Sequence, residues 1–163
     1  RRVITHNLPA EAACQTTMLA TTMPDNPTRL PRAQDDGLAV NIPKIAITTG
    51  RIDAMECVFE KMGIAQTEFG NPDSDARVHL YQSRGLTADA PEGARIDDDT
   101  PTDIEIYGSL ERMQSYDMVV SDCEGGAWDG RDTNNLFPER IATGDKIREY
   151  VNRGGRLFAL RDG

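Results

Sequence analysis

Short apolar runs alternate with helix-like stretches through the central and C-terminal parts of the chain. The runs lie at residues 44–48, 77–82, 117–121 and 156–160. Apolar runs of this length, bounded by turn residues, are typical of buried strands. Because each is followed or preceded by a helical pattern that ends in glycine, the chain is expected to form β-α units around a parallel sheet.

The clearest helical pattern follows the first of these strands. Asp53 precedes Glu56 by three residues, which is the spacing of a capping box. Apolar residues then recur at helical spacing, and Gly63 supplies a left-handed stop. We therefore predict a helix capped by Asp53, with an inward stripe made of Met55, Val58, Phe59 and Met62.

Two further helices are expected between the later strands, a short one near residues 110–114 and a longer one near 143–153. The longer one is expected to bury Ile147, Tyr150 and Val151 and to end at the glycine pair 154–155. With right-handed crossovers, the element order predicts a three-layer, flavodoxin-like α/β sheet with strand order 2-1-3-4. The loops at residues 48–51 and 122–126 should then face each other at the switch point of the sheet.

Composition limits the classes of partner and the number of domains. A chain of 163 residues is long enough for one domain with a core. With 18 Lys and Arg against 27 Asp and Glu, the net charge is −9, which disfavours nucleic acid and anionic membrane surfaces. No apolar run approaches the roughly 18 residues of a membrane span. Residues 1–42, with prolines at 24, 27 and 31, are interpreted as an irregular lead-in arm, and residues 43–163 as the α/β domain.

The loop after the first strand is a candidate anion or nucleotide site. Thr48, Thr49, Gly50 and Arg51 precede the predicted helix and resemble the hydroxyl-rich phosphate loop of flavodoxins. The commoner alternative is a glycine-permitted turn into a capped helix. The facing loop would add an acidic residue, two glycines and an aromatic that either closes a pocket or packs as a plug. These ligand-binding candidates are Glu124, Gly125, Gly126 and Trp128.

The cysteines offer a weak catalytic candidate and a disulfide. Cys123 lies in a Ser-Asp-Cys-Glu-Gly turn that resembles half of a nucleophile elbow, but a working cysteine needs a base. No histidine follows His79, so a structural Cys123 is favoured and Cys123 and His79 are only weak catalytic candidates. Cys57 and Cys123 are expected at the same edge of the sheet and could form a disulfide, with Cys14 apart. The cysteine and carboxylate spacings match no metal motif, and neither a metal nor a cofactor is expected.

Several motifs together carry a family resemblance. The segment YDMVVSDCEGG, a helix ending in YVNRGG and the strand RLFALR resemble the class I glutamine amidotransferase-like superfamily, especially its trehalose-utilisation-type branch. The phrases IPKIAITTG, RVHLYQ and SDCEG are most similar to an uncharacterised domain of large secreted bacterial surface proteins. The resemblance covers residues 42–161 and implies an amidotransferase-like sheet and an exported bacterial protein.

Carried over residue by residue, the resemblance argues against catalysis. It places the superfamily's nucleophile at Leu160 or Arg161, neither of which is a nucleophile, and its histidine and acid partners beyond Gly163. Cys123 matches the oxyanion-side loop instead. We therefore expect a partial domain, truncated at its C-terminus, or a domain reduced to a scaffold.

The resulting functional expectation is a non-catalytic α/β scaffold or interaction module of an exported bacterial protein, with an unidentified protein or small-molecule partner. One alternative is a cysteine-dependent amidotransferase or hydrolase, and another is an anion or nucleotide binder at residues 48–51. The expected location is extracellular, periplasmic or on the cell surface. Because the chain opens on Arg1 it resembles a processed piece, and a cytoplasmic location stays the alternative.

Overall fold

The computed structural model describes residues 16, 30–34, 41–83, 92–123 and 143–160, and contains a five-stranded parallel sheet. The strands are β1 (Ile45–Thr49), β2 (Phe69–Gly70), β3 (Val78–Gln82), β4 (Met118–Ser121) and β5 (Leu157–Ala159), in the order β2-β3-β1-β4-β5. The four predicted strands are confirmed within one residue at most boundaries, and so is their order. β1 lies between β3 and β4, with Ile45 in register with both Val78 and Met118.

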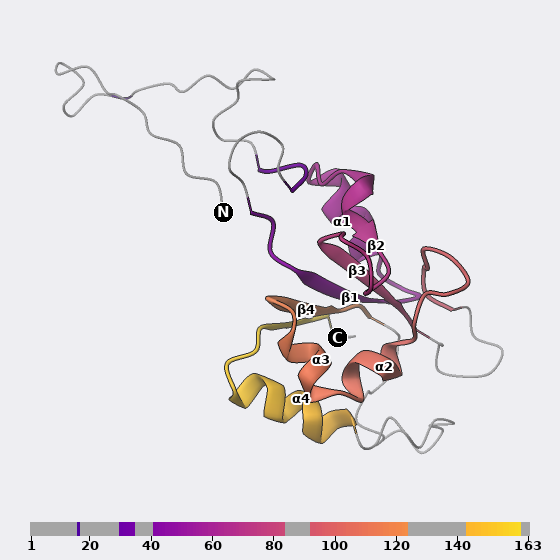
Figure 1. The fold of residues 1–163 in the computed structure, drawn as a ribbon, viewed down its shortest axis with the longest axis vertical. Coiled ribbons are helices and arrows are strands. Elements are labelled where there is room, and N and C mark those ends of the chain that lie inside the picture. Colours follow the sequence, from indigo (N-terminus) through magenta and orange to yellow (C-terminus); the bar gives the residue numbers. More distant parts are fainter. Residues whose placement is uncertain (1–15, 17–29, 35–40, 84–91, 124–142, 161–163) are drawn as a thin grey trace.

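Helices cover both faces of the sheet (Figure 1). Helix α1 (Met55–Lys61) lies on one face, and α2 (Asp103–Tyr107), α3 (Leu110–Gln114) and α4 (Thr143–Asn152) lie on the other. Because strand side chains alternate between faces, each face has its own apolar core. On the α1 face it consists of Ile45, Ile47, Val78, Leu80 and Val120; on the other face of Ala46, Tyr81, Ile106, Tyr107, Met113, Tyr116, Val119 and Tyr150.

Helix α1 differs from the prediction at its amino end. The helix starts at Met55 and its N-cap residue is Ala54, which provides no side-chain hydrogen bond, so the expected cap at Asp53 is wrong. A carboxylate from the neighbouring strand takes that role instead: the Met55 amide donates to Asp122 Oδ2 at 3.1 Å. The expected stop is confirmed, because Gly63 has a φ of 102°.

Two of the predicted inward side chains of α1 face solvent. Met55 and Phe59 pack on the sheet, whereas Val58 and Met62 are exposed. Because successive residues of a helix are rotated by 100°, Val58 does not share the face of Phe59. A single short helix also buries only a narrow stripe of side chains against the sheet. The same correction applies to α4, where Tyr150 is buried but Val151 is exposed.

The structure also contains elements that apolar patterning did not reveal. Strand β2 has only two residues, and it follows a 3₁₀ turn, η2 (Gln66–Glu68). Helix α2 begins inside the stretch interpreted as a polar loop, where Thr102 and Glu105 form a capping box. Both signals are too short for periodicity to detect.

The described part of the predicted lead-in arm contacts the α/β domain near η2. Ala65 donates its amide to the Arg32 carbonyl at 2.7 Å, and the Gln34 amide donates to Glu68 Oε1 at 2.7 Å. Gln34 Oε1 in turn accepts from the amide of Ile42, which is buried. Residues 30–34 and 41–42 are therefore attached to the domain; the remainder of the arm lies outside the described residues.

A matched pair of methionines tests this assignment of inside and outside. Met113 is 0% exposed in the core of the α2–α4 face, and Met62 is 53% exposed at the end of α1. Met113→Ala should lower the free energy of unfolding by about 2–5 kcal/mol, because it removes buried apolar volume. Met62→Ala should change it by less than about 0.5 kcal/mol. Equal losses in urea unfolding would contradict the assignment.

Candidate functional site

The carboxyl ends of β1 and β4 meet at the switch point, as the element order predicted. The Gly50 amide donates to Asp122 Oδ2 at 3.4 Å, and the Ile52 amide donates to the Cys123 carbonyl at 3.3 Å. A Cβ on residue 50 would lie 2.4 Å from that carbonyl oxygen, so only glycine allows the two connections to approach this closely. Residues 48–51 and 122–123 are thus brought together.

The hydroxyl groups of the predicted phosphate loop are turned inward. Thr48 Oγ1 forms a 2.9 Å hydrogen bond with the Tyr107 hydroxyl, and Thr49 Oγ1 donates to the Ala94 carbonyl at 2.7 Å. Both threonines are buried, and they lie on opposite faces because they are adjacent in one strand. Arg51 is exposed. The four residues are adjacent in the chain but do not converge on one point.

Asp122 occupies the position that a bound anion would take at the amino end of α1. It is 2% exposed, and Oδ2 accepts from the amides of both Gly50 and Met55. Its second oxygen, Oδ1, is buried without a hydrogen-bond partner among the described residues. Burial raises the pKa of Asp122 to about 7, and the negative charges of Glu56 and Asp53 add to the rise, while the two backbone amides partly offset it.

Glu56 is the second carboxyl group of this cluster. It follows Met55 in the first turn of α1, and its Oε2 is also buried without a partner in the described part of the chain. Burial raises the pKa of Glu56. Sequence reasoning missed this Asp122–Glu56 pair. The sequence does place these two acidic residues at the ends of adjacent predicted elements. Because acidic residues are usually exposed to solvent, that placement alone did not identify them as a buried pair.

The two weak catalytic candidates lie in unrelated settings. Cys123 is buried at the end of β4, whereas His79 is completely buried within β3 among aromatic side chains. His79 Nε2 faces the Ala76 carbonyl at 2.9 Å, so this nitrogen carries the proton and Nδ1 accepts from the Tyr116 hydroxyl, also at 2.9 Å. The Tyr81 hydroxyl lies 3.0 Å from that of Tyr116 and continues the network. Both nitrogens of His79 are therefore used inside the core.

The expected disulfide between Cys57 and Cys123 is not formed. No disulfide joins them: Cys57 is exposed and Cys123 is buried. Cys57 lies two residues after the inward-facing Met55, which places it about 200° around the helix and away from the sheet. Cys14 lies outside the described residues, as do four of the ligand-binding candidates, Glu124, Gly125, Gly126 and Trp128.

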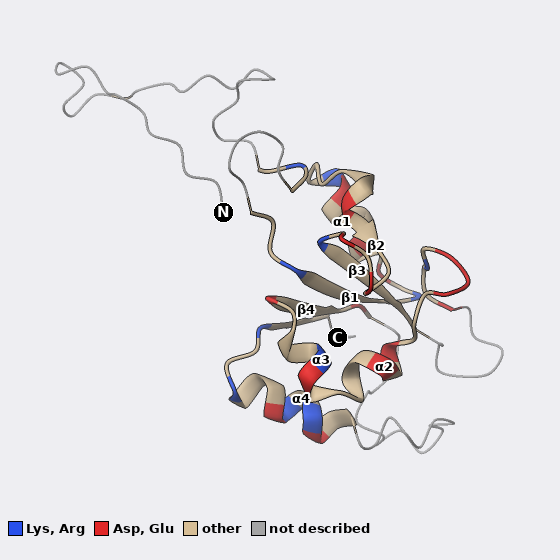
Figure 2. Ribbon diagram, in the orientation of Figure 1, with Lys and Arg blue, Asp and Glu red and all other residues tan. Residues whose placement is uncertain are grey.

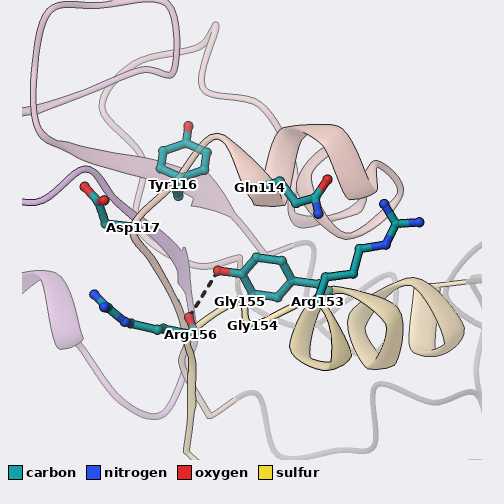
Figure 3. Close-up of a pocket in the computed structure, with 8 residues that line it drawn as sticks. Gln114, Tyr116, Asp117, Arg153, Gly154, Gly155 and Arg156 are labelled. Carbon is teal, nitrogen blue, oxygen red and sulfur yellow. Dashed lines mark hydrogen bonds between the residues drawn. The ribbon is translucent and has the colours of Figure 1, made fainter.

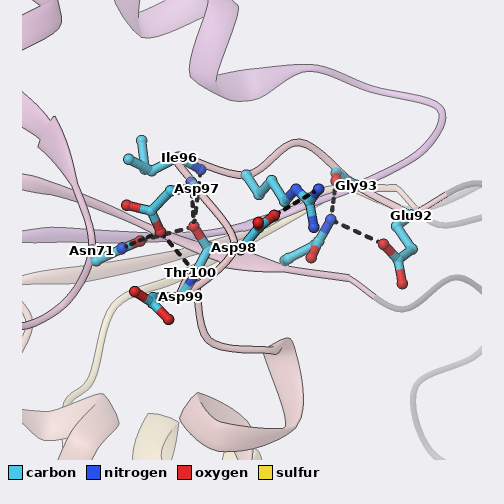
Figure 4. A network of polar contacts seen from close by, with 10 residues as sticks. Asn71, Glu92, Gly93, Ile96, Asp97, Asp98, Asp99 and Thr100 are labelled. Carbon is cyan, nitrogen blue, oxygen red and sulfur yellow. Dashed lines mark hydrogen bonds and ion pairs between the residues drawn. The ribbon is translucent and has the colours of Figure 1, made fainter.

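The acidic residues at 97–99 lie in a hydrogen-bonded turn (Figure 4). Asp97 Oδ1 accepts from the Asn71 side chain at 2.8 Å and from the Asp99 amide at 2.9 Å. Thr100 Oγ1 donates to Asn71 Oδ1 and accepts from the Ile96 and Asp97 amides. Within the described ranges, no group of three or more His, Cys, Asp or Glu residues could hold a metal ion.

A polar hollow lies at the opposite edge, near the amino ends of β4 and β5 (Figure 3). Its volume is about 290 Å³, and its lining includes Tyr150 together with Gln114, Asp117, Arg153 and Arg156. Tyr150 donates to the Arg156 carbonyl at 3.3 Å. In open α/β sheets ligands bind beyond the carboxyl ends of the strands, so this hollow lies at the less favourable edge.

Comparisons with known proteins leave the family open: no protein-family model, curated protein or solved structure matches the chain. Among the described residues, no helix is long and apolar enough to cross a membrane.

The buried Asp122 should make stability depend on pH in a defined direction. Its pKa is raised to about 7 from 3.8, so the folded state holds a proton that the unfolded state releases, and stability falls as pH rises from about 4 to 7. The stability of Asp122→Asn relative to the wild type should rise by about 4 kcal/mol between pH 4 and pH 8, since one pKa unit corresponds to about 1.4 kcal/mol and the pKa rises from 3.8 to about 7. Urea unfolding of both proteins at the two pH values measures this. A difference that is the same at pH 4 and pH 8 would refute the raised pKa.

His79 should titrate in the opposite sense. Burial, with the charge of Lys44 adding to it, lowers the pKa of His79 below 6.5. As pH falls, the unfolded chain therefore binds the proton at a higher pH than the folded chain does. The contribution of His79 to stability is complete above about pH 6.5 and is lost as pH falls below that value. NMR titration of the imidazole should give a midpoint below that of an exposed histidine; a midpoint at or above about 6.5 would contradict the buried network.

Proposed function

We propose that this chain is a non-catalytic α/β scaffold or interaction module of an exported bacterial protein. The observation that carries the proposal is the occupation of the switch point by the protein's own carboxylate. The Gly50 and Met55 amides, which could hold an external anion, both donate to Asp122. Because both amides are already engaged by Asp122, neither is left to donate to a phosphate or carboxylate ligand.

The arrangement of the nucleophile candidate also favours a non-catalytic role. Nucleophilic cysteines need a base within hydrogen-bond reach. His79 is the histidine that the described residues contain, and its ring nitrogens are engaged with Ala76 and Tyr116 on the face that α2 and α3 cover. A cysteine-dependent amidotransferase or hydrolase therefore remains the weaker candidate. It would require groups outside the described residues.

The described surface supports binding to a protein rather than to a polyanion. Figure 2 shows acidic and basic residues interspersed on α4, where Arg148 pairs with Asp145 and Arg153 with Glu149. Apolar side chains are exposed on α1 and directly before and after it, namely Val58, Ile52 and Met62. Exposed apolar residues beside polar ones are common at protein interfaces. The net charge of −9 disfavours nucleic acid.

The proposed exported location rests on the resemblance to secreted surface proteins. The absence of the expected Cys57–Cys123 disulfide lends it no further support. A cytoplasmic module with the same fold is the alternative.

Ligand and turnover assays on residues 1–163 test the proposal. Flavin mononucleotide, ATP and inorganic phosphate should leave the melting temperature unchanged, and glutamine and p-nitrophenyl acetate should not be turned over above the solvent rate. A ligand present at 100 times its Kd would stabilise the protein by about 2.7 kcal/mol, which a thermal melt detects readily.

Two variants identify the alternatives if a signal is found. Turnover that disappears in Cys123→Ser would replace the scaffold by a cysteine enzyme. Stabilisation by a phosphate-bearing ligand that weakens in Arg51→Ala would replace it by an anion binder at residues 48–51.

A further inference from the structure

The Asp122–Glu56 pair has features that an ordinary structural contact does not require. Asp122 is almost fully buried and joins three parts of the chain: the end of β4, Gly50 after β1, and Met55 at the start of α1. Yet Asp122 Oδ1 and Glu56 Oε2 are both buried without a partner among the described residues. A buried carboxylate oxygen that accepts no hydrogen bond is costly, and a second one nearby increases the cost.

The charges around Asp122 do not relieve this cost. Glu56 of α1 and Asp53 of the β1–α1 connection both act on Asp122, and both are acidic. Arg51 lies in the same connection but is exposed, and it forms no ion pair with any described residue. Strands β1 (IAITT) and β4 (MVVS) themselves contain no charged or titratable side chain. Among the residues that the structure describes, Asp122 therefore faces negative charge without a compensating cation.

We infer that Asp122 is a proton-dependent latch, closed when its carboxyl group holds a proton and loosened when the proton leaves to solvent. In the closed state, Oδ2 accepts from Gly50 and Met55 while the proton neutralises the buried group. When Asp122 ionises beside Glu56, the cluster lowers its energy by exposing a carboxylate to water, and the amide contacts break. The latch thus couples pH to the attachment of the β1–α1 connection to β4.

A proton suits this cluster better than a metal ion. Divalent cations such as Ca²⁺ take six to eight oxygen ligands, and Mg²⁺ usually keeps several waters. The two unpartnered oxygens are fully buried, and the described residues provide no group of three metal-ligating side chains here. A proton needs one oxygen and no additional space.

Amide hydrogen exchange tests the latch directly in the whole chain. The Gly50, Ile52 and Met55 amides should lose protection as pH rises from about 4 to 7, by up to tenfold per pH unit after correction for the intrinsic exchange rate, and the loss should level off above about 7. Amides of the β1–β3 pairing should not follow this pattern. Uniform protection of the three amides from pH 4 to 8 would overturn the inference.

Three variants separate the latch from general pH effects. In Asp122→Asn, exchange at the three amides should become independent of pH over this range. Asp75→Asn, which removes an exposed carboxylate, should behave as the wild type. In Glu56→Gln, the loss of protection should level off at a lower pH, because one of the like charges is gone.

The variants also keep the inference falsifiable if Asp122→Asn does not fold. In that case the test rests on Glu56→Gln, whose loss of amide protection should level off at a lower pH than in the wild type. An unchanged pH profile of amide exchange in this variant would refute the latch. The addition of 5 mM MgCl₂ or CaCl₂ to the wild type should leave the profile unchanged. Restored protection at pH 8 would mean that the cluster is a cation site instead.

Discussion

The carboxyl group of Asp122 connects the parts of this domain that define its functional edge. It receives the amides of Gly50 and Met55, and so fixes the end of β4, the exit of β1 and the start of α1 relative to one another. No local residue caps α1, so its amino end depends on this contact from a distant strand. The close approach has its own requirement, because any side chain at residue 50 would collide with the Cys123 carbonyl.

The same contact determines what the edge can do. Helix amino ends in α/β proteins commonly hold anionic ligands, since unpaired amides and the helix dipole both favour negative charge. Here the internal carboxyl group of Asp122 accepts from those amides, and the threonine hydroxyls of β1 bond to Tyr107 and Ala94. The chemistry that would serve a ligand is used within the fold. This is the physical basis for proposing a scaffold that responds to protons rather than an enzyme.

The sequence predicted the parallel sheet well, because apolar runs between glycine and proline report directly on buried strands. The order of the four main strands was predicted from the right-handedness of β-α-β crossovers, a rule that holds whatever the sequence. Elements without a long apolar run were missed, namely β2 and α2. The orientation of Val58, Met62 and Val151 was wrong, because periodicity shows where a stripe lies but not how wide a face the neighbouring elements cover.

The site was less predictable than the fold. Position at the switch point was correct for residues 48–51 and 122–123, but the role of Asp122 could not be read from the chain. It depends on two amides contributed by residues about 70 positions away in sequence and on burial that only packing creates. The predicted disulfide was wrong for a related reason. Whether Cys57 can reach Cys123 depends on the direction in which its side chain leaves α1, and that direction cannot be read from the sequence.

The most direct measurement is an NMR titration of the Asp122 side-chain carboxyl carbon in the intact chain. The account predicts a midpoint near 7, because burial beside Glu56 and Asp53 opposes ionisation. An ordinary midpoint near 4 would show that Asp122 is solvated, and would contradict both the closed switch point and the latch.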